Sequence, residues 1–389
     1  MLYKLKDIFD LQMGKTPSRN NIEYWNTNDY KWVSIADLTK TDKYIYDTKE
    51  YLSKKAVNES GIKIIPANTV IMSFKLSIGK TAITAEDMYS NEAIMAFHDK
   101  HIVEILPEYI FYLFKYKNWD DGSNKAVMGK TLNKAILSEV EIDICSIEEQ
   151  RKIVNVLDKI MNLISARKKE LSYLDTFTKA RFVEMFGDPV INSKNLPVVT
   201  LGELSELITK GASPCWQGFS YTDDSSQTLF ITSENIREGY IDLSSPKYIE
   251  DGFNEKQRRS VIRKGDFLIN IVGASIGRAA QFNLDCKANM NQAAALVRVK
   301  DNRIKNKYLL IYLNSDRAKR MYDSMKSDTG RANLSLQDIS DLNILLPAVD
   351  KQIEFENFVA QVDKSKSAVK KALDETQLLF DSLMQEYFG

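Results

Sequence analysis

The residues with catalytic or metal-binding potential are few and do not cluster along this sequence. His98 and His101 are its only histidines, and their three-residue step brings no third ligand into view, so we interpret them as surface residues and predict no metal site. Cys145, Cys215 and Cys286 lie far apart and form no C-x-x-C pair. Isolated cysteines of this kind are typical of a reduced cytosolic protein rather than of a disulfide framework.

Motifs for phosphate transfer, dinucleotide binding and methyl transfer are also missing. The sequence contains no G-x-x-x-x-G-K-[ST] phosphate loop and no G-x-G-x-x-G. None of its eight prolines adjoins another, so the Asn/Asp-Pro-Pro-Tyr/Phe motif of adenine amino-methyltransferases is absent. The carboxylates form no convincing nuclease cluster either. We therefore predict that the chain is not an enzyme by itself and binds no cofactor of its own.

Composition is that of a soluble globular protein long enough for two or more domains. The 389 residues carry 53 basic and 53 acidic side chains, so net charge gives no argument for a nucleic-acid partner. Basic runs occur locally, at 167–169, 256–259 and 263–264, although such runs are usually only solvated surfaces. Without an apolar run of membrane-spanning length or a signal-peptide core, the predicted location is cytoplasmic.

A long helix at 147–187 dominates the elements that would position any binding residues. Apolar residues return there every three or four positions without Pro or Gly, and Gly187-Asp188-Pro189 ends the pattern. This periodicity predicts an amphipathic helix with a coiled-coil seam, about 60 Å long.

The same pattern recurs 202 positions later and predicts a second long helix at 348–389. On this register Gln150 corresponds to Gln352, and Leu157 corresponds to Val359. We expect the two helices to bury their apolar stripes against each other; two unrelated surface helices are the alternative. The predicted seam consists of Ile153, Leu157, Ile160, Ile164, Leu171, Leu174, Phe355, Val359, Val362, Val369, Leu373 and Phe380.

Two globular units, predicted at 1–146 and 199–347 with a linker at 188–198, alternate with the helices. Both contain strand patterns, a Ser-Ile-Gly-basic turn (77–80 and 275–278) and an aromatic helix, in the same order. Predicted strands lie at 31–35, 69–74, 91–97, 140–144, 230–232, 267–272, 293–299 and 342–346, and the helices at 107–117 and 308–325. The predicted class is α+β, with two mixed α/β domains and a pseudo-twofold internal repeat.

This layout resembles the specificity subunit of type I restriction-modification systems over essentially the whole chain. The resemblance is carried by the two Ser-Ile-Gly-basic turns, by the segments 131–134 and 333–336, and by the helix openings at 147–153 and 349–353. One departure is that family members often have a proline pair before the Glu-Gln of the helix opening, whereas only Pro347 is present here.

The resemblance implies two target-recognition domains, which read the halves of a bipartite DNA site, and two conserved helices that pair antiparallel and set the spacer. Arg or Lys would read guanine and Asn or Gln adenine, while other polar and basic side chains hold phosphates. Candidate DNA-binding residues are Lys15, Thr16, Arg19, Lys75, Ser77, Lys80, Lys130, Thr131, Asn133, Lys210, Ser213, Trp216, Gln217, Ser275, Arg278, Asn291, Gln292, Arg331 and Asn333. The Ser-Ile-Gly turns also have a purely structural interpretation, since the backbone alone can require glycine after a core strand.

The resemblance further implies that catalysis belongs to partners. Two modification subunits would methylate adenine N6 with S-adenosylmethionine, and restriction subunits would translocate and cleave DNA with ATP and Mg. The exposed sides of the long helices would bind these partners. Two other hypotheses stay open: a coiled-coil adaptor that holds two protein-binding domains without contacting DNA, and a divergent enzyme with an unrecognised site.

Overall fold

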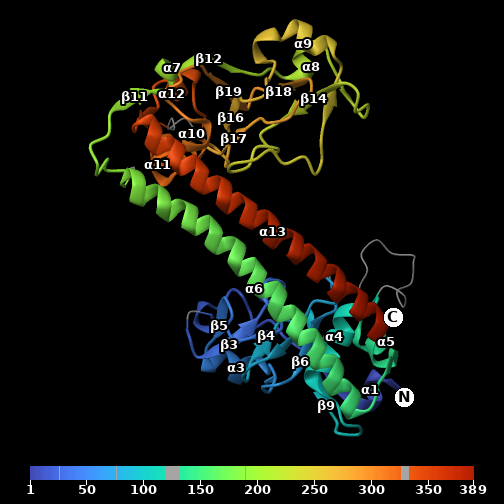
Figure 1. Cartoon of the computed structure of the whole chain (residues 1–389). Coiled ribbons are helices and arrows are strands. Elements are labelled where there is room, and N and C mark those ends of the chain that lie inside the picture. Colours follow the sequence, from blue (N-terminus) through green and yellow to red (C-terminus); the bar gives the residue numbers. More distant parts are fainter. Residues whose placement is uncertain (26, 76, 120–131, 189, 326–332) are drawn as a thin grey trace. The chain divides into compact units, whose positions relative to one another are not determined.

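The computed structural model describes residues 1–25, 27–75, 77–119, 132–188, 190–325 and 333–389 (Figure 1). The chain forms two compact units. Unit 1 comprises Met1–Lys169 and Lys370–Gly389, and unit 2 comprises Glu170–Val369. This division passes through both long helices, whereas the segments predicted from the sequence kept each helix whole. Within the described ranges, no helix combines the length and apolar composition needed to cross a lipid bilayer.

Unit 1 is built on a five-stranded sheet of order β2-β9-β6-β7-β4, with a three-stranded sheet β5-β3-β8 and the pair β1-β10. Its strands are β1 (Leu2–Lys4), β2 (Phe9–Met13), β3 (Tyr30–Val33), β4 (Tyr44–Ile45), β5 (Glu50–Leu52), β6 (Val70–Ser73), β7 (Thr81–Thr84), β8 (Tyr89–Ser90), β9 (Ile94–Asp99) and β10 (Glu141–Asp143). Its short helices are α1 (Leu5–Ile8), η1 (Ile22–Tyr24), α2 (Ile35–Lys40), α3 (Lys54–Ser60), α4 (Pro107–Tyr116) and α5 (Lys134–Glu139).

Both faces of the large sheet in unit 1 are buried. Successive side chains of a strand point to opposite faces, so Val70 and Met72 of β6 join the core beneath α4, while Ile71 joins a second cluster on the other face. This explains why the central strands are continuous apolar runs rather than alternating ones.

Unit 2 repeats this plan with sheets of order β12-β19-β16-β17, β13-β15-β14-β18 and β11-β20. Its strands are β11 (Val198–Thr200), β12 (Ser205–Lys210), β13 (Tyr221–Thr222), β14 (Thr228–Ile231), β15 (Tyr248–Ile249), β16 (Phe267–Asn270), β17 (Ala279–Gln281), β18 (Ala288–Met290), β19 (Ala294–Val299) and β20 (Asn343–Leu345). Its short helices are α7 (Leu201–Leu204), α8 (Pro214–Gln217), α9 (Gly252–Lys256), η2 (Arg258–Ser260), α10 (Asn306–Leu313), α11 (Asp316–Met325) and α12 (Leu336–Ser340).

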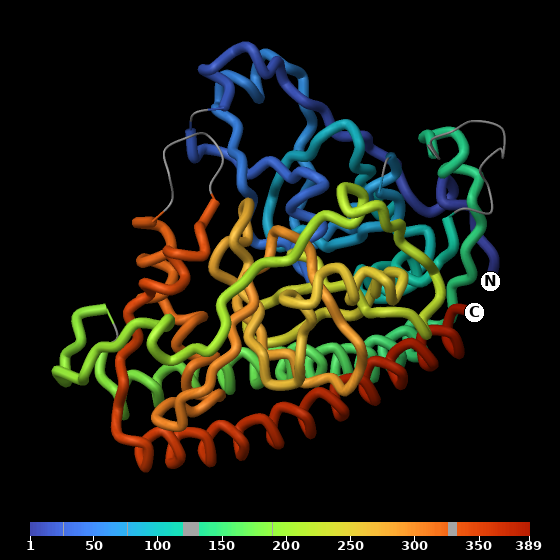
Figure 2. The backbone as a smooth tube through the Cα atoms, turned by 90° about the horizontal axis from the view of Figure 1, so that it is seen from above, coloured from blue at the N-terminus to red at the C-terminus, as the bar shows by residue number. Residues whose placement is uncertain are grey.

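The long helices α6 (Ile147–Phe186) and α13 (Val349–Phe388) each contribute one part to each unit. In unit 1 the early residues Ile160 and Ile164 of α6 share a core with Phe380 near the end of α13. In unit 2 the late residue Phe182 of α6 packs at 5.5 Å, between ring centroids, on Phe355 near the start of α13. The helices therefore pair antiparallel within each unit. Both chain ends belong to unit 1 (Figure 2).

The predicted seam residues are buried to different degrees. The fully buried ones are Ile153, Leu157, Ile160, Ile164, Phe355, Val359, Val362 and Phe380. Leu171, Leu174, Val369 and Leu373 are half-buried. Apart from Val362, the buried ones belong to a core cluster of their unit, as Leu157 does in the cluster that contains Tyr112 of α4.

A buried glutamine fastens the start of each long helix to its own unit. The side chain of Gln150 accepts a hydrogen bond from the Leu106 amide (2.9 Å) and donates to the carbonyls of Glu104 and Cys145 (3.0 Å each). Gln352 makes the equivalent three bonds, each 2.8 Å long, to Lys305, Arg303 and Pro347. Both glutamines are 0% exposed.

Some of the predicted element bounds were wrong. The strand predicted at 31–35 ends at Val33, because the Ser34 side chain accepts a hydrogen bond from the Asp37 amide and caps α2, which begins at Ile35. In two other cases an asparagine side chain acts on the backbone. The single helix predicted at 308–325 is two helices, because the Asn314 carboxamide bonds both the amide (3.0 Å) and the carbonyl (2.9 Å) of Ala279 in β17. The strand predicted at 91–97 begins only at Ile94, because Asn91 accepts a hydrogen bond from the Ala93 amide (3.0 Å) in a local turn.

Candidate nucleic-acid interface

The polar loops of unit 1 meet at one end of its large sheet. Strand β2 ends at Met13 opposite Met95, and β6 ends at Ser73 opposite Ile94, so the loops that follow both strands lie beside the loop that precedes β9. The backbone passes so closely that a Cβ on Gly14 would lie 2.2 Å from the Asn91 carbonyl oxygen. Only glycine permits this approach.

A carboxylate organises the candidate side chains at this end. The Thr16 hydroxyl donates to the Glu92 carboxylate. This bond, followed by the charges of Lys75 and Arg19, lowers the pKa of Glu92 despite its partial desolvation. The sequence analysis missed Glu92, although its position directly after a turn-forming asparagine and before a core strand was a usable signal.

Arg19 is paired with groups of its own unit, although 48% of its side chain is exposed. Its guanidinium pairs with Glu50 (Nη2 to Oε2, 3.0 Å) and lies 3.8 Å above the ring of Trp25. The Cζ atom of the same guanidinium is 4.8 Å from the centroid of the Trp32 ring. A bidentate contact from Arg19 to guanine would require it to leave Glu50.

The Ser-Ile-Gly-Lys turn has a clear structural cause. Gly79 has φ +86°, a conformation that favours glycine, and its amide donates to the Ser73 carbonyl over 2.9 Å. The Lys80 ammonium donates to Thr39 (2.6 Å). Ser77 and Lys75 are half-buried beside this turn. The backbone alone therefore explains the glycine of this turn. The turn also carries polar side chains that could contact a ligand.

The matching turn of unit 2 has the same geometry. Gly277 also has φ +86°, and its amide donates to the Asn270 carbonyl over 2.9 Å. The Asn270 carboxamide donates to the Ser275 hydroxyl (3.1 Å). The guanidinium of Arg278 has no hydrogen-bond or ion-pair partner among the residues that the structure describes. It is therefore available to a ligand.

Further candidates of unit 2 gather at the corresponding sheet end. Lys210, the last residue of β12, pairs with Ala295, next to the start of β19. Asn333 forms a backbone bridge with Val272, just beyond β16. Within the described part of the chain, no partner occupies the side chains of Lys210 and Gln292.

Three other candidates of unit 2 lie on or beside α8. Trp216 is 90% exposed. The Gln217 carbonyl accepts a hydrogen bond from Lys256 (2.8 Å), and Ser213 stands before the buried Pro214 without a side-chain cap bond.

The remaining candidates have local structural partners or cannot be placed. The Asn133 carboxamide oxygen caps α5 by accepting from the Ile136 amide (2.9 Å), and the Lys15 ammonium donates to the Ser60 carbonyl (2.5 Å). The Asn291 carboxamide accepts from the Ala293 amide (3.1 Å), as Asn91 does in unit 1. Lys130, Thr131 and Arg331 lie outside the described residues.

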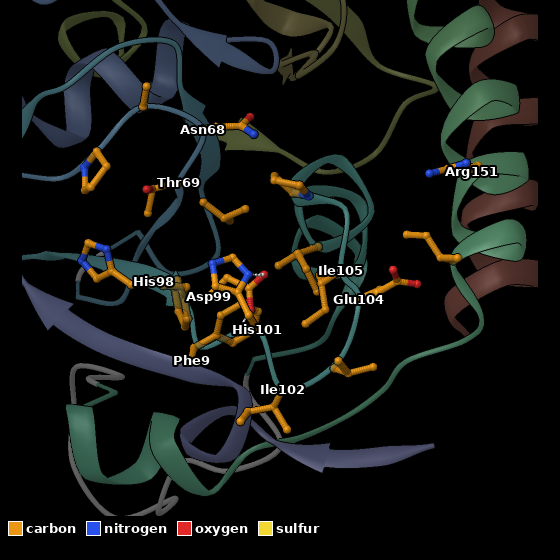
Figure 3. A pocket seen from close by; sticks show the side chains of 18 residues that line it. Phe9, Asn68, Thr69, His98, Asp99, His101, Ile102, Glu104, Ile105 and Arg151 are labelled. Atoms are coloured by element: carbon orange, nitrogen blue, oxygen red, sulfur yellow. Dashed lines mark hydrogen bonds and ion pairs between the residues drawn. The ribbon is translucent and has the colours of Figure 1, made fainter.

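The histidines border a pocket of about 690 Å³ in unit 1 (Figure 3). The interpretation of both as surface residues was wrong for His98, which is half-buried on β9. Its Nε2 has no partner among the described residues, and burial lowers its pKa. His101 is exposed, 3.3 Å from Asp99. No three potential metal ligands gather anywhere in the ranges that the structure covers.

Comparison with known proteins gives consistent matches. Residues 1–173 and 194–376 match the family model described as "Type I restriction modification DNA specificity domain". The chain is 33% identical over 213 residues to the type I restriction enzyme MjaIX specificity subunit of Methanocaldococcus jannaschii. The aligned region covers 54% of this chain and 48% of that protein. It is 27% identical over 159 residues to the EcoR124I/EcoR124II specificity subunit of Escherichia coli, with 39% of each chain covered. The chain thus aligns with about half or less of these curated relatives.

Solved structures share the fold along the whole chain. A chain from a structure of the type I R-M system, titled for its complex assembly and conformational transition, has a TM-score of 0.63 at 18% identity, covering 100% of this chain and 97% of that one. The S subunit from M. genitalium has a TM-score of 0.52 at 15% identity, with 100% and 96% covered. The predicted fold class, two mixed α/β units alternating with two long paired helices, is confirmed.

Proposed function

Because the chain belongs to the type I restriction-modification DNA specificity family, as its family-model match shows, we propose that it is the sequence-recognition subunit of such a system. Each unit would read one half of a bipartite, gapped DNA site. The chain would be non-catalytic, and methylation and cleavage would be carried out by partner subunits. A cytoplasmic location, with access to cellular DNA, is part of the same proposal.

One observation carries this proposal: the same polar sheet end is built twice. In both units a glycine loop, a left-handed Ser-Ile-Gly turn and an asparagine turn meet beside the central strands. The backbone turns at the two sheet ends are the same, whereas the side chains that these turns carry differ. Such a pair of ends suits two recognition surfaces that read different bases on a shared frame.

The candidate residues differ in whether their side chains already have a partner within the protein. Lys210, Arg278 and Gln292 have no partner among the described residues, so they would contact DNA without breaking an existing bond. Lys and Arg would hold phosphates or guanine, and Gln can read adenine. The other candidates of the sequence analysis stay predictions, with Asn133 and Arg19 the least free.

The long helices would set the distance between the half-sites. Each has 40 residues, which corresponds to about 60 Å of α-helix. One turn of duplex DNA is about 34 Å, so helices of this length are sufficient to hold two recognition domains about a turn or more apart.

Exposed apolar residues on these helices suggest where the partners bind. In unit 2 Tyr173 of α6 is 70% exposed and Phe177 is also exposed; in unit 1 Leu378 of α13 is 70% exposed beside the exposed Leu379. One such surface in each unit fits two copies of the same partner, which we propose are modification subunits. S-adenosylmethionine would bind to these partners, and ATP and Mg to any restriction subunits.

Methylation-sensitive sequencing tests the proposal directly. Cells with the partner genes and this gene should carry N6-methyladenine in a gapped motif that disappears on deletion of this gene. No difference between the two genomes would contradict the proposal. An adaptor that does not bind DNA would also lack the steep loss of duplex affinity with rising salt that phosphate contacts produce.

The spacer model has its own test. Inserting four residues, about one helical turn, at the same level of α6 and α13 should change the spacer and leave both half-sites unchanged. A change in the half-sites themselves would refute the assignment of spacing to the helices.

A further inference from the structure

Unit 2 displays an indole that no part of the described chain covers. Trp216 is 90% exposed, which is unusual because a tryptophan side chain is large and mostly apolar. Its backbone is nevertheless held firmly, since Pro214 before it is buried and Gly218 after it ends α8 in the left-handed conformation at φ +82°. The ring of Phe219 packs 5.6 Å from Phe253, between centroids, and anchors the loop.

The equivalent loop of unit 1 does the opposite at this position. Gly211 and Pro214 stand 197 positions after Gly14 and Pro17, and the same step takes Arg19 to Trp216. Arg19 is folded back onto Trp25 and Glu50, as described above. The tip of one loop is thus closed against its own unit, and the tip of the other is open.

A lysine lies beside the residue that follows the indole. The Lys256 ammonium donates to the Gln217 carbonyl over 2.8 Å, and Figure 1 shows α8 and α9 next to each other in unit 2. Residues 256–264, which start at that contact, carry five basic and no acidic side chains. An exposed aromatic ring together with nearby cations is the combination with which proteins hold bases and phosphates.

We infer that Trp216 inserts its indole against a base step of the half-site read by unit 2, while the neighbouring cations hold the flanking phosphates. This inference rests on the proposed function and deepens it. Partial unstacking by an inserted side chain costs least at flexible steps. Unit 2 therefore reads deformability in addition to base edges, and unit 1 has no such probe at the corresponding position.

The test uses the complete methylation complex and its sequenced motif. Trp216→Ala should weaken binding to the cognate duplex about 10- to 100-fold, the usual range for loss of one stacking contact. Trp216→Phe should keep most of the affinity, and Cys215→Ala, an exposed neighbour, should match the wild type. In Trp216→Ala, discrimination against mismatches should fall at one half-site only.

Fluorescence gives an independent readout. The other tryptophans, Trp25, Trp32 and Trp119, all lie in unit 1, so the difference between wild-type and Trp216→Phe emission reports on Trp216. DNA should quench that difference signal, and 2-aminopurine placed through the same half-site should brighten at one step.

Wild-type affinity and discrimination in Trp216→Ala would overturn the inference while leaving the proposed function standing. Loss of modification-subunit binding in that variant would also overturn it, because Trp216 would then be a protein contact. Failure of the proposed function is distinguishable, since the wild-type complex itself would show no preference for a gapped motif.

Discussion

Replacing Gln352 by leucine should loosen the attachment of α13 to unit 2. The substitution keeps the side-chain size but removes three buried hydrogen bonds of 2.8 Å, to the Lys305 amide and to the carbonyls of Arg303 and Pro347. At about 1 kcal/mol net for each bond, plus about 1–3 kcal/mol for the amide left unpaired, the loss is about 4–6 kcal/mol. Burial of the leucine returns about 2 kcal/mol, so the expected loss is about 2–4 kcal/mol.

Hydrogen exchange is the appropriate assay, because a chain of two units is unsuited to a single two-state unfolding free energy. The amide of Lys305 should lose about 30- to 700-fold of its protection in Gln352→Leu, at a factor of ten for each 1.4 kcal/mol. Gln150→Leu should have the same effect on Leu106 in unit 1, where the same bonds recur.

A matched control comes from the same helix. Gln377 is exposed and bonds only Asp381 (2.9 Å) among the described residues, so Gln377→Leu should change stability by less than about 0.5 kcal/mol. Protection of Lys305 within threefold of the wild type in Gln352→Leu would refute the view that the buried carboxamide anchors the helix.

Three further predictions concern single residues. Gly277→Ala should lower hydrogen-exchange protection in unit 2 by about 3 kcal/mol, and Gly79→Ala should lower it in unit 1 by about 1–2 kcal/mol; both glycines have φ +86°, but the Cβ at Gly277 would lie 2.3 Å from Tyr322. Burial lowers the pKa of His98, so the unfolded chain binds its proton first, and stability should fall as pH drops from about 6.5 through the lowered folded value; His98→Phe should flatten that part of the stability curve. Glu92→Gln removes a carboxylate that lowers the local positive charge, so binding to random duplex should tighten, and the slope of log K against log salt should steepen by up to about 1.

Each of these has a result that would contradict it. An equal loss of protection in the two alanine variants would show that Tyr322 moves aside freely. If His98→Phe left the dependence of stability on pH unchanged and the exposed His101→Gln altered it, the dependence would belong to His101 and not to His98. An unaltered salt slope in Glu92→Gln would place this sheet end away from DNA.

The long helices and the glycine turns could be predicted from the sequence because local chemistry determines them. Period-3.6 apolar residues without Pro or Gly specify α6 and α13, and a Ser-Ile-Gly triplet after an apolar strand specifies the left-handed turn at Gly79. The break at Asn314 could not be predicted, because its cause is a bond to Ala279, which is distant in the sequence.

The loops that carry the candidate residues could be placed next to strand ends from the sequence, but the contacts of each side chain could not. From the sequence alone, every lysine, arginine or asparagine in a loop is an equally good candidate for a DNA contact. Only the structure shows which of these side chains already have a partner in the protein. Arg19 is held by Glu50, and Asn133 caps a helix, whereas Arg278 has no partner among the described residues. Whether a side chain is free depends on partners that are distant in the sequence, and no local sequence pattern reveals them.

The composition of unit 1 has a consequence for how the chain is made. Its core contains Phe380 and Met384 from one end of the sequence and Ile160 and Ile164 from the first half. The 200 residues Glu170–Val369 are synthesised in between, which takes a ribosome about 10–40 s at about 5–20 residues per second. During that interval the part of the nascent α6 around Ile160 and Ile164 lacks its contacts with Phe380 and Met384, so newly made chains should depend on chaperones until synthesis of residues 370–389 closes unit 1.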